Sequence, residues 1–355
     1  MNEPEHAAKA ARTRRPMFQL SLRTWLVLTA VVAGVVGWQS RRVVLSPRNL
    51  ASMSEVATLD KDVWEIAWSP ERDRMAILGW EKPVDIRHVL SLQTIETIGK
   101  DQKLIHFAFS PVPGVVAYCK NGTTAEILHR KTGRVIELDA KDSQPGMVFS
   151  PDGSTLATGG YGTHAKLWKV EDGTLLREFD TGPSVGGLRP VFSPDGTVLA
   201  VGNRNSTTTL FDVATGRLLH RLPKSESHGL QFSPDGRTLA VAYADGSLAL
   251  WNAADGQLLH DRKTSAEELY RVDWSPDGRI LASAGLMGKI TLWNPADLSI
   301  LRELDAPEWV IGLRFSPDGR NLITAGGVSD TSKGKRSLKV WGIEGSLYSL
   351  ANRPR

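Results

Sequence analysis

Cysteine is almost absent from this chain of 355 residues, in which Cys119 is the single example. One thiol forms no intramolecular disulfide and supplies no cysteine-rich zinc site or iron–sulfur cluster. The sequence also lacks a Walker A loop and a His-Glu-x-x-His pair, and its eight histidines are scattered singly. We therefore expect no enzymatic reaction, no cofactor and no metal.

Excess positive charge is absent from most of the chain. Residues 1–50 hold eight of the 43 basic residues but only two of the 39 acidic ones, so the remainder is slightly acidic. Binding to nucleic acid needs clustered positive charge to neutralise phosphates. The main body is therefore not expected to bind nucleic acid.

Long hydrophobic runs are missing except near the N-terminus, where residues 24–40 carry no charge. Seventeen helical residues span about 26 Å at ~1.5 Å each, just short of a hydrocarbon core. Trp25 and Trp38 lie at the two ends, where amphipathic rings favour the membrane interface. This pattern predicts a transmembrane signal anchor over 24–40; a cleaved signal peptide and a buried core helix are the alternatives.

The charges around this run indicate an orientation. Five basic residues precede it and three follow it closely, so the positive-inside bias favours a cytoplasmic N-terminus and a main body on the periplasmic side. We interpret residues 1–23 as a basic, disordered tail and residues 41–52 as a linker.

A Ser-Pro dipeptide preceded by an aromatic residue occurs seven times, with spacings of 40 to 43 residues. The serines are Ser69, Ser110, Ser150, Ser193, Ser233, Ser275 and Ser316. The last five copies read Ser-Pro-Asp-Gly. Apolar residues alternate before the serine as in a half-buried strand, and the Pro and Gly then favour a tight turn.

The rest of each repeat predicts three more short strands. A Leu-Ala pair or its equivalent begins six residues past the serine in the later repeats. Eighteen residues past it, repeats three to six carry the aromatic residues Trp168, Phe211, Trp251 and Trp293. Four strands in about 40 residues are typical of a β-propeller blade. The fold class is therefore all-β: a seven-bladed propeller over 53–345, with one transmembrane helix before it and a tail over 346–355.

Closure of the ring requires a fourth strand for the last blade, because an open edge would invite aggregation. Residues 55–59 precede the first repeat where such a strand would lie, and residues 346–350 offer a second possibility. We prefer the N-terminal strand, since every other blade begins after the outer strand of its predecessor.

The Ser-Pro-Asp-Gly, Leu-Ala and Leu-Trp pattern resembles WD40 repeats of the bacterial kind over about residues 53–343. The Gly-His dipeptide of that family is absent, and the aspartate of the turn before the third strand survives clearly only as Asp245. Packing is therefore expected to hold these blades. The turn also resembles that of TolB-type propellers, which are usually six-bladed; the aromatic endings and the seven copies favour WD40.

The resemblance implies a protein-docking face, formed by the segments that lead into the first strands and the loops between the second and third strands. Blade seven has an insertion in that second loop, over 329–336. The candidate protein-binding residues on this face are Trp64, Arg189, Tyr270, Arg271, Trp309, Lys333, Lys335 and Arg336. The types Trp, Tyr and Arg are enriched at binding hot spots. Packing between blades is the alternative for Trp64 and Tyr270, and a solvated loop is the alternative for 329–336.

These observations predict a membrane-anchored scaffold that binds other proteins on its propeller. The alternatives are an envelope sensor for a ligand, or a lactonase-like or oxidoreductase propeller with a site in the central channel. The first strands offer only Glu65, His106 and Asp273 for such chemistry, from three different blades.

Overall fold

The computed structural model describes residues 45–60, 63–89, 91–140, 146–182, 187–204, 206–264, 268–286, 288–306, 309–327 and 337–343. The expected anchor over 24–40, the tail over 346–355 and the basic residues Lys333, Lys335 and Arg336 lie outside these ranges. Among the residues described, no helix has the length and apolar character needed to cross a membrane.

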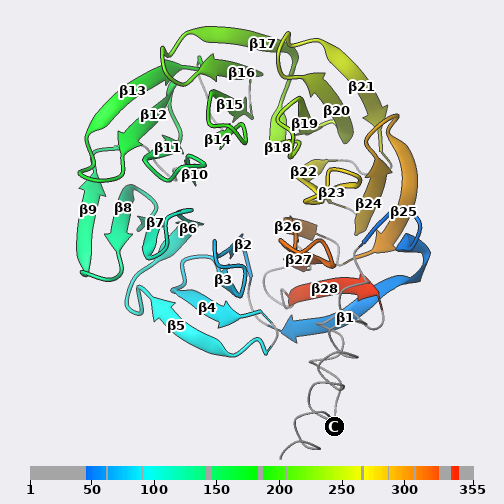
Figure 1. The fold of residues 1–355 in the computed structure, drawn as a ribbon, viewed down its shortest axis with the longest axis horizontal. Helices are drawn as coiled ribbons and strands as arrows, with labels where there is room; N and C mark the ends of the chain where they lie inside the picture. Colours follow the sequence, from blue (N-terminus) through cyan, green and yellow to red (C-terminus); the bar gives the residue numbers. More distant parts are fainter. Residues whose placement is uncertain are drawn as a thin grey trace, which may run out of the picture. The chain divides into compact units, whose positions relative to one another are not determined.

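Seven antiparallel sheets of four strands each surround a central axis in the described part of the chain (Figure 1). Blade one consists of β2 (Glu65–Trp68), β3 (Arg74–Leu78), β4 (Val84–His88) and β5 (Thr94–Ile98). Blade two consists of β6 (Leu104–Phe109), β7 (Val115–Lys120), β8 (Thr124–His129) and β9 (Arg134–Leu138). Blade three consists of β10 (Gly146–Phe149), β11 (Thr155–Gly159), β12 (His164–Lys169) and β13 (Leu175–Asp180).

The remaining blades follow the same order of strands. Blade four consists of β14 (Leu188–Phe192), β15 (Val198–Asn203), β16 (Thr207–Asp212) and β17 (Leu218–Ser225). Blade five consists of β18 (Ser227–Phe232), β19 (Thr238–Tyr243), β20 (Ser247–Asn252) and β21 (Leu258–Lys263). Blade six consists of β22 (Leu269–Trp274), β23 (Leu281–Gly285), β24 (Lys289–Asn294) and β25 (Ser299–Asp305). Blade seven consists of β26 (Trp309–Phe315), β27 (Asn321–Gly327), β28 (Ser337–Ile343) and β1 (Met53–Asp60). The predicted seven-bladed, all-β propeller is confirmed.

The ring is closed by the N-terminal strand, as predicted. β1 pairs antiparallel with β28, and its register runs from Met53 opposite Ile343 to Asp60 opposite Ser337. In Figure 1 the two strands lie side by side although they come from opposite ends of the propeller sequence. Lys339 donates a hydrogen bond to Glu55 across this pair at 2.5 Å. Blade seven thus gains a fourth strand, and β28 loses its open edge.

Part of the expected linker packs onto the ring. Leu45 and Leu50 are buried in one apolar cluster with residues of blades six and seven. The amide of Leu45 donates to the carbonyl of Gly319 at 2.8 Å, and Arg302 donates to the carbonyl of Leu50. The packed structure therefore begins by residue 45, before β1. It includes the 3-10 turn η1 (Leu50–Ser52), which directly precedes β1.

Each repeated motif forms one row of side chains across its blade. In blade three, Phe149 lies opposite Leu156, and Leu156 lies opposite Trp168. The aromatic before the serine, the leucine six residues after it and the aromatic eighteen after it are therefore cross-strand neighbours. Such rows pack against the next blade: Phe232 and Trp251 of blade five share a cluster with Leu210 of blade four. The spacing of the motif residues thus follows from the register in which the strands of a blade pair.

The Ser-Pro-Asp-Gly turns share one hydrogen-bond pattern. In each of the five, the serine hydroxyl donates to the aspartate at 2.5–2.7 Å and accepts from the amide five residues after the serine at 2.9–3.0 Å. The glycine that follows has a φ near +70°, as Gly196 shows at +73°, which other residues adopt only with strain. The hydroxyl therefore ties the two ends of the hairpin together.

Buried hydrogen bonds join the second and third strands in four blades, beyond the packing expected from the sequence. The third-strand indoles of Trp168, Trp293 and Trp341 donate to second-strand hydroxyls at 2.8–2.9 Å. Trp251 donates instead to the hydroxyl of Tyr243 at 3.0 Å. Packing is thus supplemented by one buried hydrogen bond in each of these four blades. The sequence motif did not predict these bonds because it includes the third-strand aromatic residue but not its hydroxyl partner in the second strand.

Replacing Ser193 with alanine is expected to lower the free energy of unfolding by about 1–3 kcal/mol, because the amide of Val198 then loses its acceptor in a buried hairpin. Urea titration of the two proteins measures this difference. Ser69→Ala is the matched control, since the buried Ser69 hydroxyl of blade one has no hydrogen-bond partner among the described residues and its loss should change stability by less than about 0.5 kcal/mol. Equal effects of the two substitutions would contradict this account of the turns.

Candidate functional site

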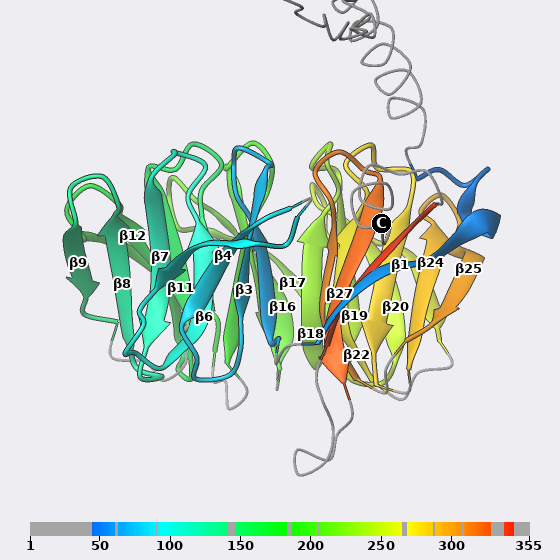
Figure 2. The ribbon, with the colours of Figure 1, turned by 90° about the horizontal axis from the view of Figure 1, so that it is seen from below.

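One face of the ring collects two kinds of segment from every blade. Because the four strands of a blade alternate in direction, the approach to the first strand and the loop between the second and third strands lie at the same end. The Ser-Pro turns lie at the opposite end. Figure 2 shows the strands running across the thickness of the ring between these two ends. We call the first end the docking face.

The centre of the ring contains a pocket to which every blade contributes its first strand. Seven equivalent positions, each four residues before the repeated serine, line it: Glu65, His106, Gly146, Arg189, Gly229, Arg271 and Gly312. Trp64, His228 and Arg314 also line it. The 41-residue repeat therefore becomes a ring of side chains around one channel. Of the residues predicted from the sequence, it brings Trp64, Arg189 and Arg271 together here.

Glu65 and His106 form a pair across blades one and two. Nδ1 of His106 lies 3.2 Å from Oε2 of Glu65. Burial raises the pKa of Glu65, but the charge and hydrogen bond of His106, with the charges of Arg271 and Arg314, lower it more, so the net shift is downward. The carboxylate is therefore ionised at neutral pH.

Asp273, the third candidate for channel chemistry, does not join this pair. Its carboxylate accepts the amide of Phe315 at 2.7 Å and lies 3.5 Å from Nη1 of Arg314, both in blade seven. Burial raises its pKa, against the lowering effect of Arg314. Asp273 thus links blades six and seven. The described residues contain no group of three His, Cys, Asp or Glu side chains that could hold a metal ion.

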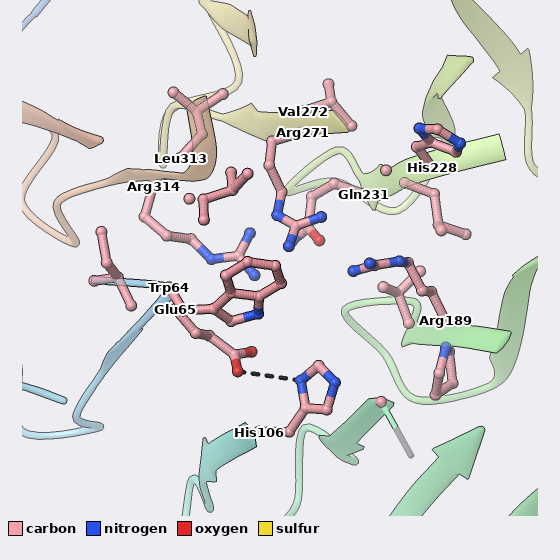
Figure 3. Close-up of a pocket in the computed structure, with 18 of the residues that line it drawn as sticks. Trp64, Glu65, His106, Arg189, His228, Gln231, Arg271, Val272, Leu313 and Arg314 are labelled. Carbon is pink, nitrogen blue, oxygen red and sulfur yellow. Dashed lines mark hydrogen bonds and ion pairs between the residues drawn. The ribbon is translucent and has the colours of Figure 1, made fainter. Parts of the chain in front are cut away.

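Three arginines point into the space beside Trp64, from β14, β22 and β26 (Figure 3). They are Arg189, Arg271 and Arg314. Burial, together with the charges of Arg189 and Arg314, lowers the pKa of Arg271 to about 9, against the opposing charge of Glu65. Burial also lowers the pKa of Arg189. The channel therefore concentrates positive charge at its centre.

Several aromatic side chains lie on the docking face, where the central channel opens; we call this opening the channel mouth. Trp64 packs edge-to-face on Trp80, with ring centroids 4.6 Å apart, and Tyr270 lies 4.8 Å from the ring of His228. Tyr270 does not line the pocket itself. Trp309, at the start of β26, is 37% exposed.

Sequence reasoning missed three residues of this face. Trp80 and Tyr161, the latter 44% exposed, lie in loops between second and third strands. Arg314 lies two residues before Ser316, on the same side of its strand as the position that faces the channel in other blades. A search of the loops between second and third strands for aromatic residues finds Trp80 and Tyr161. A search for charged residues two as well as four residues before each repeated serine finds Arg314.

The lone thiol is buried next to the first strand of blade two, where Cys119 lies opposite His106. Cys119 is buried in β7, and burial raises its pKa to about 12. The group is therefore protonated at neutral pH and unsuited to nucleophilic attack.

Three protein families match parts of the sequence. The WD domain, G-beta repeat family matches residues 138–169, and the anaphase-promoting complex subunit 4 WD40 domain matches residues 223–270. The eukaryotic translation initiation factor eIF2A family matches residues 262–354. A search of curated proteins finds no match. Together with the seven four-stranded blades, the repeat matches support a propeller of the WD40 type.

His228 is expected to make the fold sensitive to acid. Burial, with the charges of Arg204, Arg189 and Arg271, lowers its pKa from 6.5 to about 4, against the opposing charge of Glu268. The unfolded chain therefore takes up a proton below about pH 6.5 while the folded protein does so only near pH 4. Stability is complete above pH 6.5 and falls between these two values.

The size of this loss is on the order of 2 kcal/mol, after allowance for solvent at the open channel. His228→Phe removes the titrating group but keeps a ring beside Tyr270. Urea unfolding of both proteins at pH 7.5, 6 and 4.5 measures the effect, and the variant should lose less stability across the range. A variant that shows the same loss as the parent contradicts the assignment.

Proposed function

We propose that this chain is a membrane-anchored scaffold on which other proteins dock. WD40 propellers are suited to protein–protein interaction, and the described chain supplies a ring of that kind. The observation that carries the proposal is the gathering of aromatic and arginine side chains on one face. Those side chains are Trp64, Trp80, Tyr161, Tyr270, Trp309, Arg189, Arg271 and Arg314.

The composition of this face fits a hot spot. Tryptophan, tyrosine and arginine dominate the residues whose truncation weakens interfaces. Tryptophan and tyrosine bury a large area with few rotatable bonds, and the arginine guanidinium forms paired hydrogen bonds. Trp309 and Tyr161 are exposed at the rim, while Trp64 lies at the channel mouth. A partner that covers the mouth would contact several blades together, which a rigid ring permits without rearrangement.

The anchoring part of the proposal rests on residues 24–40 and their flanking charges. The uncharged run has the composition of a signal anchor, and the excess of basic residues before it places the propeller on the periplasmic side. The basic loop with Lys333, Lys335 and Arg336 would extend the docking face in blade seven. Such an arrangement would hold docked proteins close to the membrane.

Affinity capture of the full-length chain from its own membranes tests the proposal. A protein partner should be recovered near stoichiometry, and the double variant Tyr161→Ala/Trp309→Ala should reduce its recovery at least about tenfold, because hot-spot truncations commonly cost 2 kcal/mol or more. Both side chains are exposed, so the variant should fold. A chain without residues 24–40 should no longer sediment with washed membranes.

The matched control is Leu218→Ala/Leu258→Ala. These leucines are exposed to a similar degree but begin outer strands at the end of the ring that carries the Ser-Pro turns. Their loss should leave the recovery of the partner unchanged. Recovery of the propeller alone, or equal loss with both double variants, would overturn the docking face.

A further inference from the structure

We propose that the mouth of the central channel is a binding site for an anionic group, a carboxylate or a phosphate, held by Arg189, Arg271 and Arg314 beside Trp64. The inference goes beyond the scaffold function, because the site would take a small anion as well as the acidic group of a bound peptide. It stands whether or not a protein docks on the face above it.

The geometry is the first support. The three guanidinium groups come from blades four, six and seven, and all three side chains line the same pocket. Figure 3 shows them converging on one space, with the indole of Trp64 among them. Guanidinium forks match the planar or tetrahedral oxygens of carboxylates and phosphates. Three forks directed at one point would therefore surround a single anionic group.

The balance of charge is the second support. Among the described residues that line the pocket, the three arginines face one carboxylate, Glu65, and that carboxylate is engaged by His106 at 3.2 Å. Asp273 lies beside Arg314. No ion pair joins Arg189 or Arg271 to a described carboxylate, and the one side-chain hydrogen bond of Arg271 to a described residue goes to the carbonyl of Tyr270 at 3.1 Å.

The energetic consequence points the same way. Like charges in a partly desolvated pocket repel one another, and the lowered pKa of Arg271 reports this repulsion together with burial. His228 stays neutral at pH 7 and adds no charge. An anion at the centre would compensate the charges of Arg189 and Arg271 at once. The ring holds them in place, so binding needs no movement of the backbone.

Isothermal titration calorimetry on the full-length chain in non-ionic detergent tests the site with two probes, inorganic phosphate and an acetylated, amidated hexaglutamate peptide. At least one probe should bind in dilute buffer, and added salt should weaken it. The double variant Arg189→Gln/Arg271→Gln should weaken that probe at least about tenfold. The exposed pair in Arg237→Gln/Arg262→Gln removes the same charge elsewhere and should have less than a twofold effect.

The two probes identify the source of the anion. Binding of phosphate alone assigns the site to a small anion, and binding of hexaglutamate assigns it to an acidic segment of a polypeptide. The proposal is overturned if neither probe binds, or if the channel and control variants weaken binding equally. Arg189→Lys/Arg271→Lys keeps the charge without the forks; should the glutamine variant fail to fold, an undiminished affinity in the lysine variant overturns the proposed forks. Probe binding without partner capture would leave this site standing and refute only the scaffold.

Discussion

The pairing of β1 with β28 is the contact on which the rest of the structure depends. Every blade uses its neighbours to cover its apolar faces, so a ring with one incomplete blade would leave a face and an edge open to water. β1 supplies the missing strand from the other end of the propeller sequence, and Leu45 and Leu50 extend the seal onto blades six and seven. Closure thus couples the N-terminal segment to the stability of the whole ring.

Closure also determines the chemistry of the centre. The first strands meet around the axis only because seven blades complete the circle, and equivalent positions of the repeat then face one channel. Arginines 189 and 271, which are far apart in sequence, are held near each other despite their repulsion. A free-standing blade could not enforce this. The positive centre and the aromatic rim are therefore products of the same constraint.

Much of the fold could be predicted because its motifs repeat. The Ser-Pro spacing predicted the number of blades, and the positions of the aromatic residues predicted the cross-strand register that Phe149, Leu156 and Trp168 show. The repeat shows which positions of the seven blades are equivalent, but it does not predict which side chains contact one another in the channel. The pairing of Glu65 with His106, and the hydrogen bond from the amide of Phe315 to Asp273, depend on how side chains of neighbouring blades are oriented. Residues outside the repeat, such as Leu45, follow no periodic pattern, so their packing onto the ring could not be predicted.

Site-specific photo-cross-linking in native membranes is the most direct test that partners meet the docking face. A photoreactive residue would replace the exposed Lys103, which leads into β6 on that face, or the exposed Lys131, which lies between β8 and β9 at the opposite end. The account predicts a discrete protein adduct from position 103 and none from position 131. Adducts from position 131 alone would show that partners meet the other end of the ring, and would contradict the account.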